Sequence, residues 1–176
     1  MPRTMTVGRA EAMERALEVP SDLAPEGIRE IAQELRPLLA DIFALYLKTK
    51  NFHWHMTGPH YRDYHLMLDE QADQLFVMTD VVAERTRKLG APTLHSVGEI
   101  SAHQRIPDDD RVGVAPETML AELRDDNLAL TRYLRGAHEV CDKQGDVATA
   151  SLIEVWIDET ERRTWFLAET VGARSG

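Results

Sequence analysis

The fold is decided by residues 51–90, which read NFHWHMTGPHYRDYHLMLDEQADQLFVMTDVVAERTRKLG. Gly58 and Pro59 predict a tight turn at the end of one helix. The residues after them predict a single long helix from about 60 to 89. Gly90 is typical of the position just past a helix end. This stretch therefore predicts a helix end, a turn and a second long helix.

Four residues of the second helix are candidate metal ligands, arranged in two pairs. His65 and Asp69 are four positions apart, as are Asp80 and Glu84, so each pair lies on one helical face. Asp69 and Asp80 also share a face, because eleven positions correspond to about three turns plus 20°. Along the helix axis they are separated by roughly 16 Å, which is too far for one ion. One copy of the helix therefore cannot build the site alone.

A second copy of the chain could complete the site. The two pairs are symmetric about the middle of the helix, so an antiparallel two-fold axis there would place Asp69 beside Asp80 of the partner subunit. The same axis would place His65 beside Glu84 of the partner subunit and create two equivalent sites per dimer. His53, before the turn, is the natural extra ligand from the chain that supplies His65 and Asp69. The sequence thus predicts a metal site at a subunit interface.

Each candidate also has a purely structural interpretation. Charged residues on helices usually form a solvated face, and the symmetric spacing and the nearby His53 are what favour metal binding here. Trp54 is compatible with a core position. His55 and His60 flank the turn and are interpreted as surface or packing residues rather than ligands.

The remaining sequence predicts three more long helices around this one. An apolar stripe follows Pro25, and Pro37 within it predicts a kink or a restart of the helix near Arg36. Two further helices are predicted from Pro116 to about 144 and from about 146 to 171. The core-facing stripe of the second helix is expected to comprise Tyr61, Leu68, Ala72, Leu75, Val82 and Leu89.

Residues 91–115 read as a long crossover between the second and third of these helices. Ser96 and Glu99 have capping-box spacing and predict a short helix near 96–102. The expected fold class is all-α, a ferritin-like four-helix bundle with a long crossover carrying a short helix between helices 2 and 3. We expect a flexible arm at 1–22, the bundle at 23–172 and a tail at 173–176.

Composition narrows the function. The 176 residues, 43% of them hydrophobic, suit one well-cored domain, and no apolar run is long enough for a membrane span. No secretory signal is visible, and the single Cys141 cannot form an internal disulfide, so we expect a cytoplasmic protein. The net charge of −10 argues against a general nucleic-acid surface. No glutamate begins a Glu-x-x-His motif, which argues against a di-iron site inside one bundle.

From about residue 26 to 170 the sequence resembles the Dps family, the DNA-binding proteins of starved cells, also called mini-ferritins. The most specific piece is KTKNFHWHMTGPHYRDYHLMLDEQ followed by TDVVAER, and TWFLAE at 164–169 is similar to the family's final helix. The resemblance implies iron ligands from one subunit at His53, His65 and Asp69, and from its two-fold mate at Asp80 and Glu84. It also implies that Trp54 takes up stray oxidising equivalents.

The resemblance further implies a hollow dodecamer that oxidises ferrous iron, preferably with hydrogen peroxide, and stores ferric mineral against oxidative stress. Oxygen remains open as an oxidant. It also implies an acidic pore, for which Asp146, Glu154 and Asp158 are candidates, although Ser151 stands where many relatives have an aspartate. Two alternatives remain: a nucleoid-associated, DNA-compacting protein with a secondary metal site, and an inert helical assembly. The Lys-rich amino-terminal tail that many relatives use to bind DNA is missing here.

Overall fold

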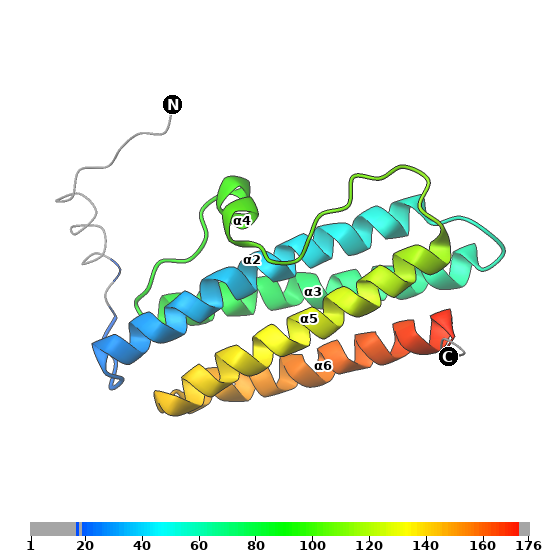
Figure 1. Cartoon of the computed structure of the whole chain (residues 1–176). Coiled ribbons are helices and arrows are strands. Elements are labelled where there is room, and N and C mark those ends of the chain that lie inside the picture. The colour runs from blue at the N-terminus through cyan, green and yellow to red at the C-terminus, as the bar shows by residue number, and fades with distance from the viewer. Residues whose placement is uncertain (1–16, 18, 173–176) are drawn as a thin grey trace.

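Four long helices lie side by side in the computed structural model, which describes residue 17 and residues 19–172. They are α2 (Pro25–His55), α3 (Tyr61–Lys88), α5 (Pro116–Lys143) and α6 (Val147–Val171), and a short α4 (Val97–His103) lies outside them (Figure 1). The predicted all-α four-helix bundle with a short helix in its crossover is confirmed. The predicted arm lies mostly, and the predicted tail wholly, outside the described residues.

The helix ends follow from local chemistry. Pro25 and Pro116 occupy the first positions of α2 and α5, where a missing backbone N–H costs nothing. Gly58 and Gly90 have φ angles of +97° and +81°, a conformation that a side chain would strain. α2 runs as one helix through Pro37, so a restart near Arg36 is wrong. The loss of one backbone hydrogen bond there is offset by the burial of the residues around it.

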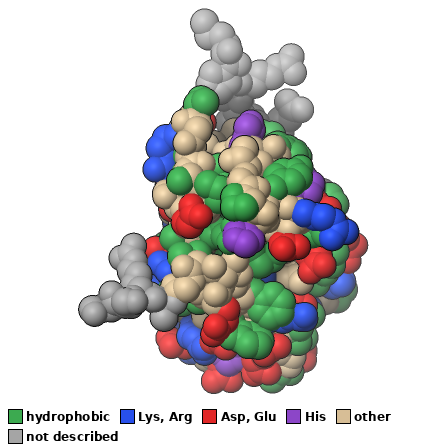
Figure 2. Space-filling model, turned by 90° about the vertical axis from the view of Figure 1, so that its right-hand side faces the viewer, with side chains coloured by type: hydrophobic (Ala, Val, Ile, Leu, Met, Phe, Trp, Pro, Cys, Tyr) green, Lys and Arg blue, Asp and Glu red, His purple; other side chains and the backbone are tan. Residues whose placement is uncertain are grey.

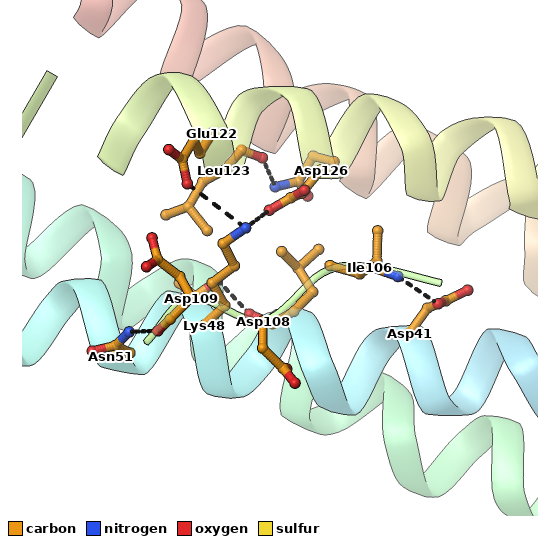
Figure 3. Close-up of polar contacts among 12 residues, drawn as sticks. Asp41, Lys48, Asn51, Ile106, Asp108, Asp109, Glu122, Leu123 and Asp126 are labelled. Carbon is orange, nitrogen blue, oxygen red and sulfur yellow. Dashed lines mark hydrogen bonds and ion pairs between the residues drawn. The ribbon is translucent and has the colours of Figure 1, made fainter. Parts of the chain in front are cut away.

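The crossover returns the chain along α2 to the end of the bundle where α5 begins (Figure 1). Asp41 of α2 is fully buried and accepts hydrogen bonds from the Ile106 backbone N–H, at 3.1 Å, and from the Arg105 backbone N–H and guanidinium. Further along, the Asn51 side-chain amide donates to the Asp109 carbonyl oxygen at 3.1 Å (Figure 3). These contacts hold an otherwise irregular segment against α2.

The hydrophobic core runs along the inside of the bundle. Of the stripe expected on the second helix, five residues are buried, but Tyr61 is 45% exposed, because it is the first residue of α3 and lies beyond the packed part of the bundle. No helix of the described residues is long and apolar enough to cross a membrane. The core residues of the four long helices include Leu35, Leu45, Phe52, Leu68, Leu75, Val82, Leu123, Leu130, Ile153 and Leu167.

Candidate metal centre

His53 and His65 face each other across the turn between α2 and α3. His53, in the last turn of α2, is buried, and its ring stacks on that of His65 with the centroids 3.7 Å apart. His53 Nδ1 lies 2.8 Å from the His65 carbonyl oxygen, and His65 Nδ1 lies 3.0 Å from the His53 carbonyl oxygen. Because a carbonyl oxygen only accepts, each Nδ1 donates its proton and each Nε2 presents a lone pair. Metal-binding histidines are commonly held in this way.

Asp69 lies one turn after His65 on α3 and joins this pair. Its Oδ1 is 3.7 Å from His53 Nε2, so the carboxylate and the imidazole lone pair converge. The same oxygen accepts a hydrogen bond from Lys50 Nζ at 2.5 Å. This hydrogen bond holds the pKa of Asp69 below its usual range and raises the pKa of Lys50. The structure therefore places Asp69 near the histidine pair, although the three side chains are not close enough to hold a metal ion by themselves, and Lys50 already contacts the carboxylate.

Lys50 is the residue of this region that the sequence analysis did not identify. It lies three positions before His53, and this helical spacing could have pointed to it. Lysine is not an expected metal ligand, because its ammonium group has hydrogen-bond donors and no lone pair. Only the packing of α2 against α3 places this ammonium on Asp69.

Asp80 and Glu84 lie further along α3 and do not join the histidines within the protomer. Both are exposed, and Glu84 pairs with Lys88 at 3.4 Å in a contact where both side chains are more than 60% exposed. Within the part of the chain that the structure describes, no three His, Cys, Asp or Glu side chains are grouped closely enough to hold a metal ion. One protomer thus carries the two partial ligand sets separately.

The ligand face of α3 also exposes large hydrophobic side chains. Phe76 is 55% exposed and Val77 is 65% exposed, and Leu66 is 43% exposed. At the helical repeat, all three fall within about 80° of Asp69 around the helix axis. Exposed apolar side chains gathered on one face are typical of a protein–protein contact. This face therefore combines candidate ligands with the composition of an interface.

Trp54 lies at the same end of the bundle and points outward. It is 59% exposed, so its interpretation as a core residue is wrong for the protomer. With Leu47 and Val112 it lines a largely apolar groove of about 710 Å³ between α2 and the loop that precedes α5. Figure 2, which views this end of the bundle, shows histidine, acidic and hydrophobic side chains exposed near one another.

A positively charged side chain, Arg163, is buried inside the bundle. Arg163 of α6 is 1% exposed, and its guanidinium donates to Asn127 Oδ1 at 2.9 Å and to Thr160 Oγ1 at 2.8 Å. Burial lowers the pKa of Arg163 to about 10, still high enough to keep the charge at neutral pH. A buried positive charge with these neutral partners repels a metal ion. The core is thus chemically unsuited to the di-iron site that the missing Glu-x-x-His motif also argues against.

The acidic residues considered for a pore behave differently from one another. Asp146 is 3% exposed and caps α6 by accepting from the Thr149 backbone N–H at 3.0 Å, and Arg85 of α3 donates to it at 2.7 Å. Asp146 is therefore buried and already paired within the protomer, and its assignment to a pore is wrong. Glu154 lies at the surface and contacts His138 Nε2 at 3.1 Å.

Comparison with known proteins agrees with this architecture. The family model described as a ferritin-like domain matches residues 32–174. DNA protection during starvation protein 1 of Deinococcus radiodurans is 27% identical over 82% of this chain and 70% of its own length. DpsC from Streptomyces coelicolor superposes with a TM-score of 0.85 at 24% identity, over 90% of this chain and 93% of that one.

A Dps protein from Vibrio cholerae O1, described as a member of a broad superfamily of ferritin-like diiron-carboxylate proteins, superposes with a TM-score of 0.81. It is 22% identical, over 88% of this chain and 100% of that one. The matching domain covers most of the chain, and the relatives named for starvation protection match the same bundle. This chain therefore belongs to the ferritin-like proteins and, within them, to the Dps family.

Proposed function

We propose that this protein oxidises Fe(II), with hydrogen peroxide as the oxidant, at sites formed between two subunits, and stores the ferric product inside a hollow dodecamer. Each site would take His53, His65 and Asp69 from one subunit and Asp80 and Glu84 from the other. The observation that carries the proposal is the paired histidines, whose Nδ1 atoms are both satisfied by carbonyl oxygens so that both Nε2 atoms are free to bind iron.

The exposed ligand face of α3 supports the shared site. Asp80 and Glu84 lie on this face together with Phe76 and Val77, so a partner helix that covers the hydrophobic residues also covers the carboxylates. An antiparallel partner related by a two-fold axis near the middle of α3 brings opposite ends of the ligand face together. Completion of the site and burial of the hydrophobic face then occur in one contact.

The ligand types suit ferrous iron. Imidazole nitrogen and carboxylate oxygen bind this ion well, and a small number of protein ligands leaves positions for a substrate. Iron is here a substrate, and two Fe(II) ions supply the two electrons that cleave the O–O bond of peroxide. With two protons the products are two Fe(III) ions and two waters, so no hydroxyl radical is released.

Trp54 has a secondary role in this proposal. It follows the ligand His53 directly, and its indole is 59% exposed at the same end of the bundle. An indole on the residue next to a ligand could supply the missing electron when only one Fe(II) reacts with peroxide, so that Trp54 is oxidised in place of another molecule. We therefore assign Trp54 the uptake of stray oxidising equivalents.

A test by complementation distinguishes a shared site from one within a subunit. One variant carries His65→Ala and Asp69→Ala, the other carries Asp80→Ala and Glu84→Ala, and each is expected to lose accelerated oxidation of Fe(II) by peroxide. When both are co-expressed in equal amounts, half of the dimers contain one of each, and each mixed dimer regains one intact site. Activity should then return to about a quarter of the native level.

Several outcomes would count against the proposal. If the mixed assembly stays inactive while both variants assemble normally, the ligands do not come from two subunits. If the unmodified protein does not accelerate oxidation beyond the Ala variants, the site is not a ferroxidase. A shell with no stoichiometric Fe(II) binding would instead favour an inert helical assembly.

DNA compaction has less support from this chain. The name of the Deinococcus relative refers to DNA protection, but removal of iron and peroxide also protects DNA without contact. Thirty acidic residues against twenty Lys and Arg leave a surplus of negative charge, which phosphates repel. We expect no retardation of linear DNA in a gel at physiological salt, and a clear shift would revive the DNA-binding alternative.

A further inference from the structure

Tyr61 is a tyrosine whose ring lies against a candidate ligand. It is the first residue of α3, one turn before His65, and the two side chains therefore share a helical face. The ring centroids of Tyr61 and His65 are 5.0 Å apart and the ring planes differ by 29°, which is an offset stack. His65 in turn stacks on His53 at 3.7 Å. Ring contacts thus connect the Tyr61 phenol to both histidines of the candidate site.

We propose that Tyr61 supplies an electron through its contact with His65 when a single Fe(II) at the site reacts with peroxide. This inference rests on the proposed function of the same site. With two Fe(II) ions the iron supplies both electrons that peroxide needs, and Tyr61 takes no part. With one Fe(II) ion the second electron comes from the phenol, so Tyr61 acts beside Trp54 as a donor.

The reaction balances with one electron from iron and one from Tyr61. Cleavage of the O–O bond of hydrogen peroxide to two waters takes two electrons and two protons. Fe(II) gives one electron and becomes Fe(III). Tyr61 gives the other electron together with its phenolic proton and becomes a tyrosyl radical. The second proton comes from the surrounding water, and no hydroxyl radical is released.

Two of the other tyrosines are in surroundings that do not suit this role. The guanidinium of Arg105 lies over the ring of Tyr133, 3.7 Å from its centroid, and a cation on the ring face opposes the removal of an electron. Tyr46 pairs with Phe76 at 5.3 Å, and a phenyl ring does not bind iron. Neither ring is stacked on a candidate ligand.

The remaining tyrosine, Tyr64, offers a matched control. It also lies near the start of α3 and also contacts a histidine ring, that of His60, at 5.5 Å. His60 is not a candidate ligand. Of the four tyrosines of the chain, all of them in the described residues, Tyr61 alone therefore combines a phenol with a stacking contact to a candidate ligand.

The experiment detects radicals by electron paramagnetic resonance. The full assembled protein is loaded in the absence of oxygen with one Fe(II) per completed site, mixed with excess hydrogen peroxide and frozen at once. The unmodified protein should give a tyrosyl signal, whose hyperfine pattern changes when the protein contains ring-deuterated tyrosine. The signal should weaken when two Fe(II) ions per site are supplied, because the iron then provides both electrons.

Two variants separate the phenol from the packing of its ring. Tyr61→Phe keeps a ring against His65 and removes the hydroxyl group, so a purely structural role would survive the change. In this variant most of the tyrosyl signal should be lost, and a spin trap in solution should capture more hydroxyl radical. Tyr64→Phe removes a phenol from the same helix and should keep the signal. Light scattering checks that both variants assemble to the same mass as the unmodified protein.

The outcomes are distinct for the two proposals. If the unmodified protein does not accelerate the oxidation of Fe(II) by peroxide, the proposed function fails and the role of Tyr61 fails with it. If oxidation is accelerated but the tyrosyl signal is absent, or persists in Tyr61→Phe, or is lost equally in Tyr64→Phe, the proposed function stands and the role of Tyr61 is refuted. A signal from tryptophan alone would assign the donated electron to Trp54 and also refute the role of Tyr61.

Discussion

Replacement of Asp41 by alanine should detach the crossover from α2 and cost about 3 kcal/mol of stability. Asp41 is fully buried and accepts a hydrogen bond from the backbone N–H of Ile106, which is itself only 1% exposed. Leaving the buried Ile106 N–H without a partner costs about 1–3 kcal/mol of stability. Loss of the hydrogen bond from the Arg105 backbone N–H costs about 1 kcal/mol more. The ion pair to Arg105, whose side chain is 34% exposed, adds at most about 1 kcal/mol.

The assay is thermal unfolding at a fixed protomer concentration, because association also stabilises the folded chain. For a chain of this size, about 3 kcal/mol corresponds to a fall in Tm on the order of 10 °C. Amide hydrogen exchange should also rise at Ile106, whereas it should not change in the middle of α5. The matched control is Asp108→Ala, because Asp108 is exposed and accepts a hydrogen bond from Gln104, and its loss should cost less than about 0.5 kcal/mol.

A second variant tests the reason for the loss. Asp41→Asn fills the same space. Its amide oxygen can replace Oδ1, which accepts from the backbone N–H groups of Arg105 and Ile106, but its N–H₂ group would face the Arg105 guanidinium that donates to Oδ2. If the backbone hydrogen bonds are the main cause, Asn should recover more than half of the fall in Tm that Ala produces. A Tm within about 2 °C of the unmodified protein for Asp41→Ala, or an Asn variant as unstable as the Ala variant, would refute this reasoning.

Three further predictions concern other parts of the bundle. Burial raises the pKa of the Cys141 thiol to about 12, so the native protein should resist a thiol reagent at pH 8 and react only when unfolded; rapid labelling of the native state would contradict this. Burial alone would raise the pKa of Asp146, but hydrogen bonds from Thr149 and Arg85 outweigh it and lower the pKa. The stability from this carboxylate is present above its unfolded pKa of about 3.9 and is lost as pH falls through the lower folded value, so Asp146→Asn should flatten the fall in Tm between about pH 4 and 2. If Tm falls equally steeply with pH in Asp146→Asn, the Asp146 carboxylate is not the cause of the fall. Phe76→Glu, on the ligand face of α3, should reduce the assembled mass in light scattering and weaken Fe(II) binding while the far-ultraviolet circular dichroism stays helical; an assembly of unchanged mass would show that this face is not an interface.

The limits of the sequence are clearest where one helix meets another. The periodic apolar residues, the two prolines at helix starts and the glycines after α3 and α5 act locally, so the order and extent of the helices could be predicted from the chain alone. Tyr61 and Pro37 were the exceptions, because the packing around a residue, and not its place in a pattern, decides whether it is buried or breaks a helix.

The sequence by itself determined the spacing of the candidate ligands along α3, since a helix has a fixed rise and rotation per residue. Only the tertiary structure decided which atoms meet across helices: the stacking of His53 on His65, the Lys50 ammonium on Asp69, the burial of Asp146 under Arg85, and the guanidinium of Arg163 in the core. The physical reason is that positions within a helix follow from local geometry, whereas contacts between helices depend on how the whole apolar core packs.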